Sequence, residues 1–268
     1  MEQAVNAKPR ARLSSVANSI RLLTSFSGEE DELGITTLAT RLRLAKSTVH
    51  RLATTLTSAG FLEQNGDTGK YRLGVALFEL GALVRRRMDV ANEARPKLRE
   101  LLEKTGETVQ LGIIDHFSVL YVYEMESRHA IRMAAAVGAR APLHCTAVGK
   151  VLLAHQPVDY VKQLIAQGLK AHTANSMTKR EALLAVLNEV AEREYAIDDE
   201  ESEEGLRAVA APVRNHTGNV IAALGVAAPV HRMTKRDMQT CVPSVMATAA
   251  AVSARLGYIP SRKAVLTE

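Results

Sequence analysis

Hydrophobic residues between positions 34 and 74 recur at helical spacing in two segments and then alternate with polar residues. This pattern predicts a helix, a tight turn, a second helix and a short two-stranded hairpin. The second helix is expected over about 46–58, with an apolar stripe made of Val49, Leu52, Ala53 and Leu56. Gly60 is free to adopt a left-handed conformation and is expected to end this helix. The order of these elements predicts a winged helix-turn-helix.

Shorter signals predict the two helices that precede this one. Thr36 or Thr37 can cap the first of the pair, because a threonine hydroxyl accepts a hydrogen bond from an orphan amide. That helix is expected to bury Leu38, Ala39 and Leu42. A further helix over about 15–27 opens the domain, and its predicted buried stripe is Val16, Ile20, Leu23 and Phe26.

The hydrophobic pattern changes character after position 88. A helix over 75–88 has few predicted partners and is interpreted as a linker. Helices are then expected at 90–105, 146–155, 158–167 and 234–257, and strands at 108–114, 118–125, 131–137, 208–213 and 220–227. Thr178 and Glu181 have the spacing of a capping box, which predicts a helix from there to about Glu194. Strands at both ends, with helices between them, predict an α+β domain on a mostly antiparallel sheet.

The basic excess of the chain lies in its first third. Residues 1–88 contain thirteen Lys/Arg and eight Asp/Glu, a net charge of +5, whereas residues 89–268 contain twenty-one of each. A basic excess on the predicted DNA-binding part of the chain is the electrostatic pattern expected of a DNA-binding surface. A winged helix that binds another protein has no reason to hold all of it. No apolar run is long enough to span a membrane and the N-terminus has no signal-peptide pattern, so no membrane partner is expected.

The outer face of the predicted 46–58 helix carries side chains that contact phosphates and base edges in a major groove. Lys70 and Arg72 alternate with Tyr71 and Leu73 in the hairpin, so one strand face can meet DNA while the other packs inward. A solvated helical hairpin gives the same pattern, and the charge placement favours DNA binding, although an excess of five charges does not by itself exclude a solvated surface. The candidate DNA contacts are Lys46, Ser47, Thr48, His50, Arg51, Lys70 and Arg72, with Lys46, Lys70 and Arg72 on phosphates.

The cysteines and histidines give no expected catalytic or metal site, and no cofactor is predicted. Cys145 and Cys241 lie far apart and are interpreted as reduced thiols in a cytoplasmic protein. His144 adjoins Cys145, but neighbours on a strand point to opposite faces, and no third ligand or triad partner is spaced to join them. A buried, hydrogen-bonded histidine is the preferred role.

Three blocks in register resemble the IclR family of bacterial transcriptional regulators. They are KSTVHRL in the second helix, GARAPLHCTAVGK at 138–150, and YAIDDEE at 195–201 followed by GLRAVAAPV at 205–213. The resemblance spans about 15–256 and implies a winged helix-turn-helix over 15–74, a linker helix over 75–88 and a GAF-like effector-binding and oligomerisation domain over 89–258. A flexible basic tail (1–14) and a C-terminal tail (259–268) flank them. The family often has a proline directly before KST, and this chain has Ala45 there. A proline at that position only preorganises the start of the helix, so its absence is not expected to prevent DNA binding.

The resemblance also implies dimers that commonly pair into tetramers, palindromic operator DNA, and small organic acids or aromatic catabolites as effectors. Matched by position, the implied effector pocket comprises Met133, Thr146, Ala147, Val148, Asp198, Leu206, Ala208, Gly225 and Ala227. Exposed amides at the start of the 146–155 helix suit a carboxylate. Small apolar residues at 208, 225 and 227 favour a larger, more apolar acid. Asp198 and Lys150 each have a structural alternative, as a strand-end cap and as an ion-pair partner.

These observations predict a sequence-specific transcriptional regulator of a catabolic operon, with repression favoured over activation, and not an enzyme. The alternative is a small-molecule hydrolase or transferase with a vestigial winged helix, using His144 or Cys145. No Ser/His/Asp arrangement, phosphate loop or metal cluster in the sequence supports it.

Overall fold

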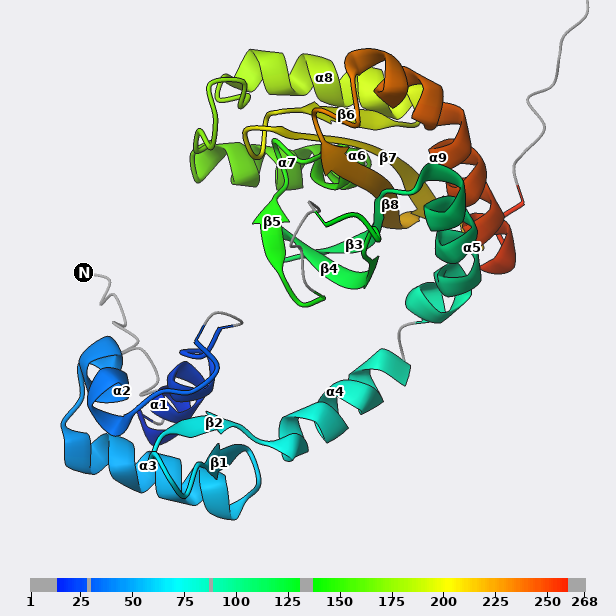
Figure 1. Cartoon of the computed structure of the whole chain (residues 1–268). Helices are drawn as coiled ribbons and strands as arrows, with labels where there is room; N and C mark the ends of the chain where they lie inside the picture. The colour runs from blue at the N-terminus through cyan, green and yellow to red at the C-terminus, as the bar shows by residue number, and fades with distance from the viewer. Residues whose placement is uncertain (1–13, 28–29, 87–88, 131–136, 260–268) are drawn as a thin grey trace, which may run out of the picture. The chain divides into compact units, whose positions relative to one another are not determined.

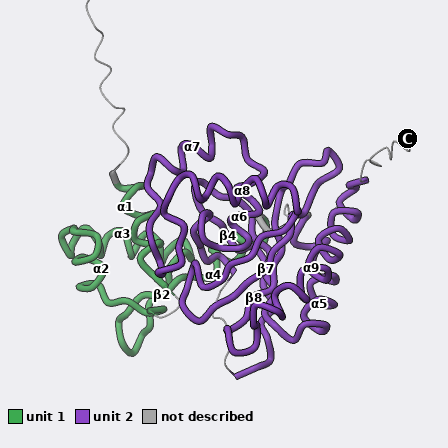
Figure 2. Tube along the Cα trace, turned by 90° about the horizontal axis from the view of Figure 1, so that it is seen from above, with its two compact units in different colours: residues 1–87 green, residues 88–268 purple. Residues whose placement is uncertain are grey.

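The computed structural model describes residues 14–27, 30–86, 89–130 and 137–259. The chain divides into two compact units, residues 1–87 and 88–268, coloured separately in Figure 2. None of the described helices is both long and apolar enough to cross a membrane. The expected α+β class is confirmed, with an N-terminal winged helix-turn-helix and a C-terminal domain on an antiparallel sheet.

The first unit begins with three helices, α1 (Ser14–Leu23), α2 (Ile35–Leu42) and α3 (Lys46–Ser58). The predicted stripe of α1 is wrong in its first half, because Val16 and Ile20 are exposed and Leu22 is fully buried instead. The helix ends at Leu23, and only its last turn reaches the core that α2 and α3 form with Leu38, Val49 and Leu52. Helical spacing alone does not reveal how much of a helix lies over its neighbours.

The ends of α2 and α3 test two predicted caps. The prediction that Thr36 or Thr37 caps α2 is wrong, since the helix begins earlier, directly after Gly34, and has no side-chain cap. The stop at Gly60 is confirmed. Its φ is +73°, its amide donates to Thr57 O at 3.0 Å, and the Phe61 amide donates to Leu56 O at 2.9 Å. These two hydrogen bonds form a Schellman motif, which provides donors for two backbone carbonyls at the end of α3.

The wing is a short antiparallel pair, β1 (Leu62–Gln64) and β2 (Tyr71–Leu73), followed by α4 (Val75–Arg86). Tyr71 packs into the core as expected, but Leu73 is exposed. The prediction that both residues face inward is therefore correct for Tyr71 and wrong for Leu73. The strand ends at Leu73, beyond the edge of the small core. Phe78 and Leu83 on α4 are also exposed within this unit.

The second unit is built on a sheet in the order β5-β4-β3-β8-β7-β6, with every neighbouring pair antiparallel (Figure 1). The strands are β3 (Thr108–Asp115), β4 (Ser118–Met125), β5 (Arg140–Pro142), β6 (Ala196–Asp199), β7 (Leu206–Arg214) and β8 (Val220–Pro229). Helices α5 (Asp89–Thr105) and α9 (Lys235–Arg255) cover one face. Helices α6 (Ala147–Ala154), α7 (Val158–Ala166) and α8 (Arg180–Arg193) cover the other. Each face therefore has its own hydrophobic core.

The strand expected at 131–137 falls almost wholly outside the described residues, and Val137 itself lies in a turn. The prediction of a capping box at Thr178 is wrong, because α8 begins at Arg180, its N-cap residue is Lys179, and no side chain caps it. A capping box is present instead at α9, where the Thr234 hydroxyl accepts from the Asp237 amide and the Asp237 carboxylate accepts from the Thr234 amide.

Candidate functional site

The outer face of α3 is open to solvent in the first unit. Val49, Leu52 and Ala53 are buried beneath it. Of the residues predicted to read DNA from this helix, Lys46, Ser47, His50 and Arg51 are exposed and Thr48 is half-buried. A helix with one buried stripe and an opposite polar face of this kind can enter a major groove.

The cationic side chains of this unit differ in their partners. Among the described residues, the structure records no hydrogen bond or ion pair for the side chains of Lys46, Arg51 and Lys70. Arg72, by contrast, pairs across the wing with Glu63, with Nε and Oε2 2.9 Å apart. This ion pair is exposed and so contributes little to stability. A phosphate can replace Glu63 at low cost, but Arg72 is not free in the way that Arg51 is.

A cavity of about 600 Å³ lies between the sheet and the start of α6 in the second unit. Eight of the nine residues expected to line an effector pocket do line it: Thr146, Ala147, Val148, Asp198, Leu206, Ala208, Gly225 and Ala227. The ninth, Met133, lies outside the described residues. The absence of a side chain at Gly225 lets Val209 and Val148 lie close to its backbone, because a Cβ there would lie 3.0 Å from Val209 O and 3.3 Å from Val148 Cγ2.

The N-terminus of α6 presents hydrogen-bond donors at this cavity. The Thr146 hydroxyl caps the helix by accepting from the Gly149 amide at 3.0 Å, and it donates to Pro142 O at 2.7 Å. The cap leaves the amides of Ala147 and Val148, which belong to the first turn, without a partner among the described residues. Both residues line the cavity. Two amides without a partner at a helix N-terminus are able to donate hydrogen bonds to a carboxylate.

Asp198 holds the loop that closes one side of the cavity. Its Oδ1 accepts from the Glu201 amide at 2.8 Å, and its Oδ2 accepts from the Ser202 hydroxyl. Burial raises the pKa of this carboxyl, and the hydrogen bonds from Ser202 and Glu201 oppose the rise. Asp198 thus lines the cavity but uses its oxygens for the loop, which supports the structural alternative. Nearby, buried Lys150 ion-pairs with Glu201 and is not part of the cavity wall, so it too has a structural partner.

Sequence reasoning missed polar residues that the sheet brings to the same cavity. Gln110 on β3 and Tyr121 on β4 line it. Gln110 also donates to Glu124 Oε2 at 3.3 Å, and burial raises the pKa of Glu124 to about 7. The available signal was a glutamine at an alternating position inside an apolar strand, which indicates a hydrogen-bonding role on one sheet face.

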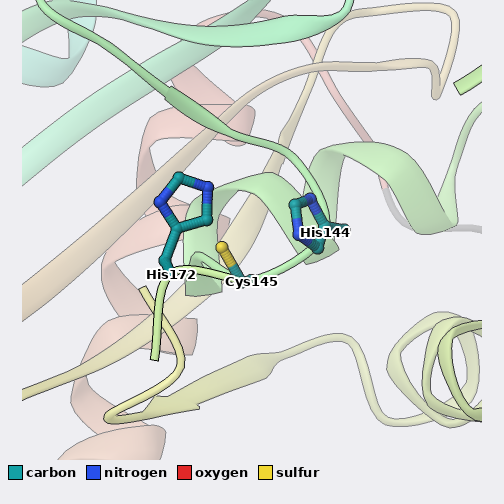
Figure 3. Close-up of side chains that lie close together, drawn as sticks. All are labelled: His144, Cys145 and His172. Carbon is teal, nitrogen blue, oxygen red and sulfur yellow. The ribbon is translucent and has the colours of Figure 1, made fainter. Parts of the chain in front are cut away.

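His144 and Cys145 were expected on a strand. They lie instead in the turn before α6. Both are buried. His172, from the loop between α7 and α8, joins them, and one ligand atom from each residue lies within 4.8 Å of the other two (Figure 3). The expectation that no third residue could reach this pair is therefore wrong, because side chains in a turn do not alternate. The predicted hydrogen bond of His144 is confirmed, with Nε2 2.9 Å from Lys170 O.

Known proteins resemble both units. The family profile described as the IclR helix-turn-helix domain matches residues 15–66, and the one described as bacterial transcriptional regulator IclR C-terminal matches residues 82–254. HTH-type transcriptional regulator KdgR of Escherichia coli (strain K12) is 41% identical over 248 residues, which cover 92% of this chain and 94% of that protein.

Two further proteins extend the comparison. Transcriptional repressor IclR of Escherichia coli (strain K12) is 29% identical over 231 residues, covering 85% of this chain and 84% of that protein. Among solved structures, an IclR homologue from Microbacterium hydrocarbonoxydans, crystallised with 4-hydroxybenzoate, gives a TM-score of 0.83 at 26% identity. That match covers 90% of this chain and 98% of the homologue.

Proposed function

The chain belongs to the IclR family of bacterial transcriptional regulators, and from this premise we propose that it represses a catabolic operon until a small organic acid occupies its C-terminal cavity. Its relatives are named as regulators, which gives no support to the alternative of a hydrolase or transferase. Repression is favoured because one relative is named a transcriptional repressor. The site of action is the cytoplasm, where the operator DNA lies.

The exposed face of α3 supports the DNA-binding half of this proposal. Arg51 and Lys46 have no acidic partner among the described residues, so their charge is available to DNA. Arg51 is assigned to a guanine edge or a phosphate in the major groove, with Ser47, Thr48 and His50 beside it. Lys46, Lys70 and Arg72 are assigned to phosphates, which fix the position of the helix but carry no sequence information.

The cavity supports the effector half. The amides of Ala147 and Val148 suit a carboxylate, and the small side chains at 208 and 227 leave room for an apolar body. Gln110 and Tyr121 add hydrogen-bonding groups to the wall. An aromatic or medium-chain acid with a hydroxyl substituent therefore matches the cavity better than a very small oxoacid. The homologue crystallised with 4-hydroxybenzoate is consistent with this class of effector.

Exposed apolar side chains support a homo-oligomer. Val16 and Ile20 on α1, and Phe78 and Leu83 on α4, are exposed in a single copy of the first unit. A second copy of the chain would cover such surface, and two-fold symmetry matches a palindromic operator. The proposed oligomer is a dimer that pairs into a tetramer. Effector binding would favour one arrangement of the dimer and so change the spacing of its two recognition helices.

The test is fluorescence anisotropy of the full chain with DNA from its own upstream intergenic region, at several salt concentrations. We expect nanomolar binding that survives excess random DNA, falls steeply with salt and is reversed by a hydroxylated aromatic acid. Calorimetry then measures the acid directly. Binding that ignores DNA sequence, with and without acids, would contradict the regulator. Micromolar binding of glyoxylate or pyruvate, with no binding of aromatic acids, would contradict the effector class alone.

A further inference from the structure

The geometry points to a binding site for one transition-metal ion, Zn²⁺ being the best match, formed by His144, Cys145 and His172 beside the cavity (Figure 3). It is the one grouping of three such ligands recorded among the described residues. The proposal depends neither on DNA binding nor on the identity of the effector. It concerns three side chains that the effector chemistry leaves unused.

The separations suit a single ion after a small movement. Each residue offers an atom within 4.8 Å of the other two. In a tetrahedral zinc site, Zn–S bonds of about 2.3 Å and Zn–N bonds of about 2.0–2.1 Å place ligand atoms roughly 3.5 Å apart. Closing the difference requires a shift of about 1 Å, and His172 is exposed and can supply it by side-chain rotation.

The backbone fixes the tautomer of one histidine. A carbonyl oxygen only accepts, so the 2.9 Å contact with Lys170 O places the hydrogen on His144 Nε2 and leaves a lone pair on Nδ1. A histidine that ligates a metal commonly donates its other N–H to a carbonyl in this way. Because Lys170 lies two residues before His172, the same hydrogen bond ties the loop of the third ligand to the turn of the first two.

The loop that carries His172 is held from its other side as well. Its own amide donates to the Ser176 hydroxyl at 2.9 Å, and that hydroxyl donates to Glu201 O at 2.6 Å. The adjacent Thr173 hydroxyl donates to Glu200 O, also at 2.6 Å. These bonds fix the backbone of His172 against the loop after β6. The third ligand is thus positioned by the fold rather than by chance proximity on the surface.

The surroundings leave one coordination position open. Cys145 is fully buried and His144 is nearly so, whereas His172 lines the cavity. Three protein ligands leave the fourth position of a tetrahedral zinc ion for water or an anion. One thiolate and two imidazoles favour Zn²⁺ over Mg²⁺ or Ca²⁺, which prefer oxygen. On binding, a metal–sulfur bond replaces the S–H bond of Cys145, and the proton passes to solvent.

Cobalt substitution tests this site, because tetrahedral Co²⁺ with a thiolate ligand absorbs strongly and Zn²⁺ does not. The untagged full chain is stripped with a chelator and titrated with Co²⁺. We expect saturation at one equivalent per chain, a sulfur-to-cobalt charge-transfer band, and loss of that band on adding Zn²⁺. Cys145→Ser should abolish the band, and His172→Ala should weaken Co²⁺ binding at least tenfold.

Matched controls separate this site from adventitious binding. Cys241→Ser removes the other thiol and His129→Ala removes an exposed histidine elsewhere in the unit, and both should retain the band. His172 is exposed, so His172→Ala is not expected to disturb folding, and circular dichroism checks this. No uptake by the stripped protein would overturn the proposal. A charge-transfer band that survives Cys145→Ser, or undiminished binding by His172→Ala, would overturn it equally.

Discussion

At the scale of the residue, the structure separates cations that are free from cations that are already paired. Arg51 has no acidic partner among the described residues, whereas Arg72 shares the wing with Glu63. Both lie in the unit that holds the whole basic excess. The proposed roles differ in the same way, since Arg51 is assigned to a guanine edge or a phosphate and Arg72 to a phosphate alone.

We expect Arg51→Ala to weaken operator binding by about 1–3 kcal/mol while changing binding to random DNA much less. Arg72→Ala should weaken both kinds of DNA alike and by a smaller amount, since Arg72 must first leave Glu63. Anisotropy with operator and random duplexes measures the two effects. An operator affinity left unchanged by Arg51→Ala would remove Arg51 from the reading surface.

Glu124 makes the stability of the second unit depend on pH. Burial raises its pKa from 4.5 to about 7, so the folded protein binds this proton more tightly than the unfolded chain. Glu124 therefore reduces stability progressively as the pH rises from about 4.5 to 7. Glu124→Gln should stabilise the protein by about 1–2 kcal/mol at pH 8, allowing for partial exposure, and by much less at pH 5.

Urea denaturation followed by tyrosine fluorescence measures this change, because five of the six tyrosines lie in the second unit and tryptophan is absent. The exposed Glu103→Gln serves as the control and should stay within about 0.5 kcal/mol at both pH values. An equal effect of Glu124→Gln at pH 5 and pH 8 would show that packing, not ionisation, is responsible.

The residues that the sequence placed around one cavity came from a resemblance to a family, and the residues that it missed come from segments without such a resemblance. The lining residues Thr146, Ala147 and Val148, together with Asp198, Leu206 and Ala208, belong to the resemblance blocks, whereas Gly225 and Ala227 on β8 were matched by position outside them. Gln110 and Tyr121 come from strands without such a block. His172 comes from a loop, and its approach to Cys145 depends on hydrogen bonds made by Lys170 and Ser176. No local pattern encodes such an approach.

At the scale of the element, helix beginnings show which capping signals the fold uses. Thr234 and Asp237 form a complete capping box at α9. Thr178 has the same kind of spacing to Glu181, yet α8 starts one residue too late for it to act as the cap. The packing of Leu183, Leu187 and Val190 supports α8 without it.

Thr234→Ala should therefore destabilise the second unit by about 1 kcal/mol, because it leaves an amide of the first turn of α9 unpaired. Thr178→Ala is the matched control and should change stability by less than about 0.5 kcal/mol. Both are measured by urea denaturation at neutral pH. Equal losses in the two variants would mean that Thr178 caps α8 in solution.

Long elements with a clear period were predictable, and short ones were not. The bounds of α3 match the prediction, since a complete apolar stripe and a glycine stop both act locally. The edge strands β5 and β6 have three and four residues and exist through pairing with β4 and β7. The buried stripe of α1 was wrong because burial depends on which neighbours a helix meets, not on its own period.

At the scale of the whole molecule, the two units differ in net charge. Residues 1–88 carry the net charge of +5 and residues 89–268 are neutral in sum, so the net charge that favours an approach to DNA lies in the first unit. The sequence predicted an antiparallel sheet but not its order. The central pair joins β3 to β8, with Thr108 opposite Ala227, and such distant pairing leaves no local trace.

Thermodynamic linkage gives a test of the intact regulator. If an effector lowers operator affinity by some factor, saturating operator DNA must lower effector affinity by the same factor. We expect a factor of roughly 5–150, the usual range of allosteric coupling. Calorimetry of the effector with free and DNA-bound protein measures one side, and anisotropy measures the other. An effector that binds equally well to both forms would not be the regulatory one.

The sheet of the second unit also acts as a partition. Residues that face α5 and α9 form one core, and residues that face α6, α7 and α8 form another, to which the cavity belongs. Substitutions on opposite faces share few contacts, so their effects on stability are close to independent. A lineage can therefore exchange the side chains around the cavity and come to sense another metabolite, while the scaffold behind the sheet is inherited unchanged.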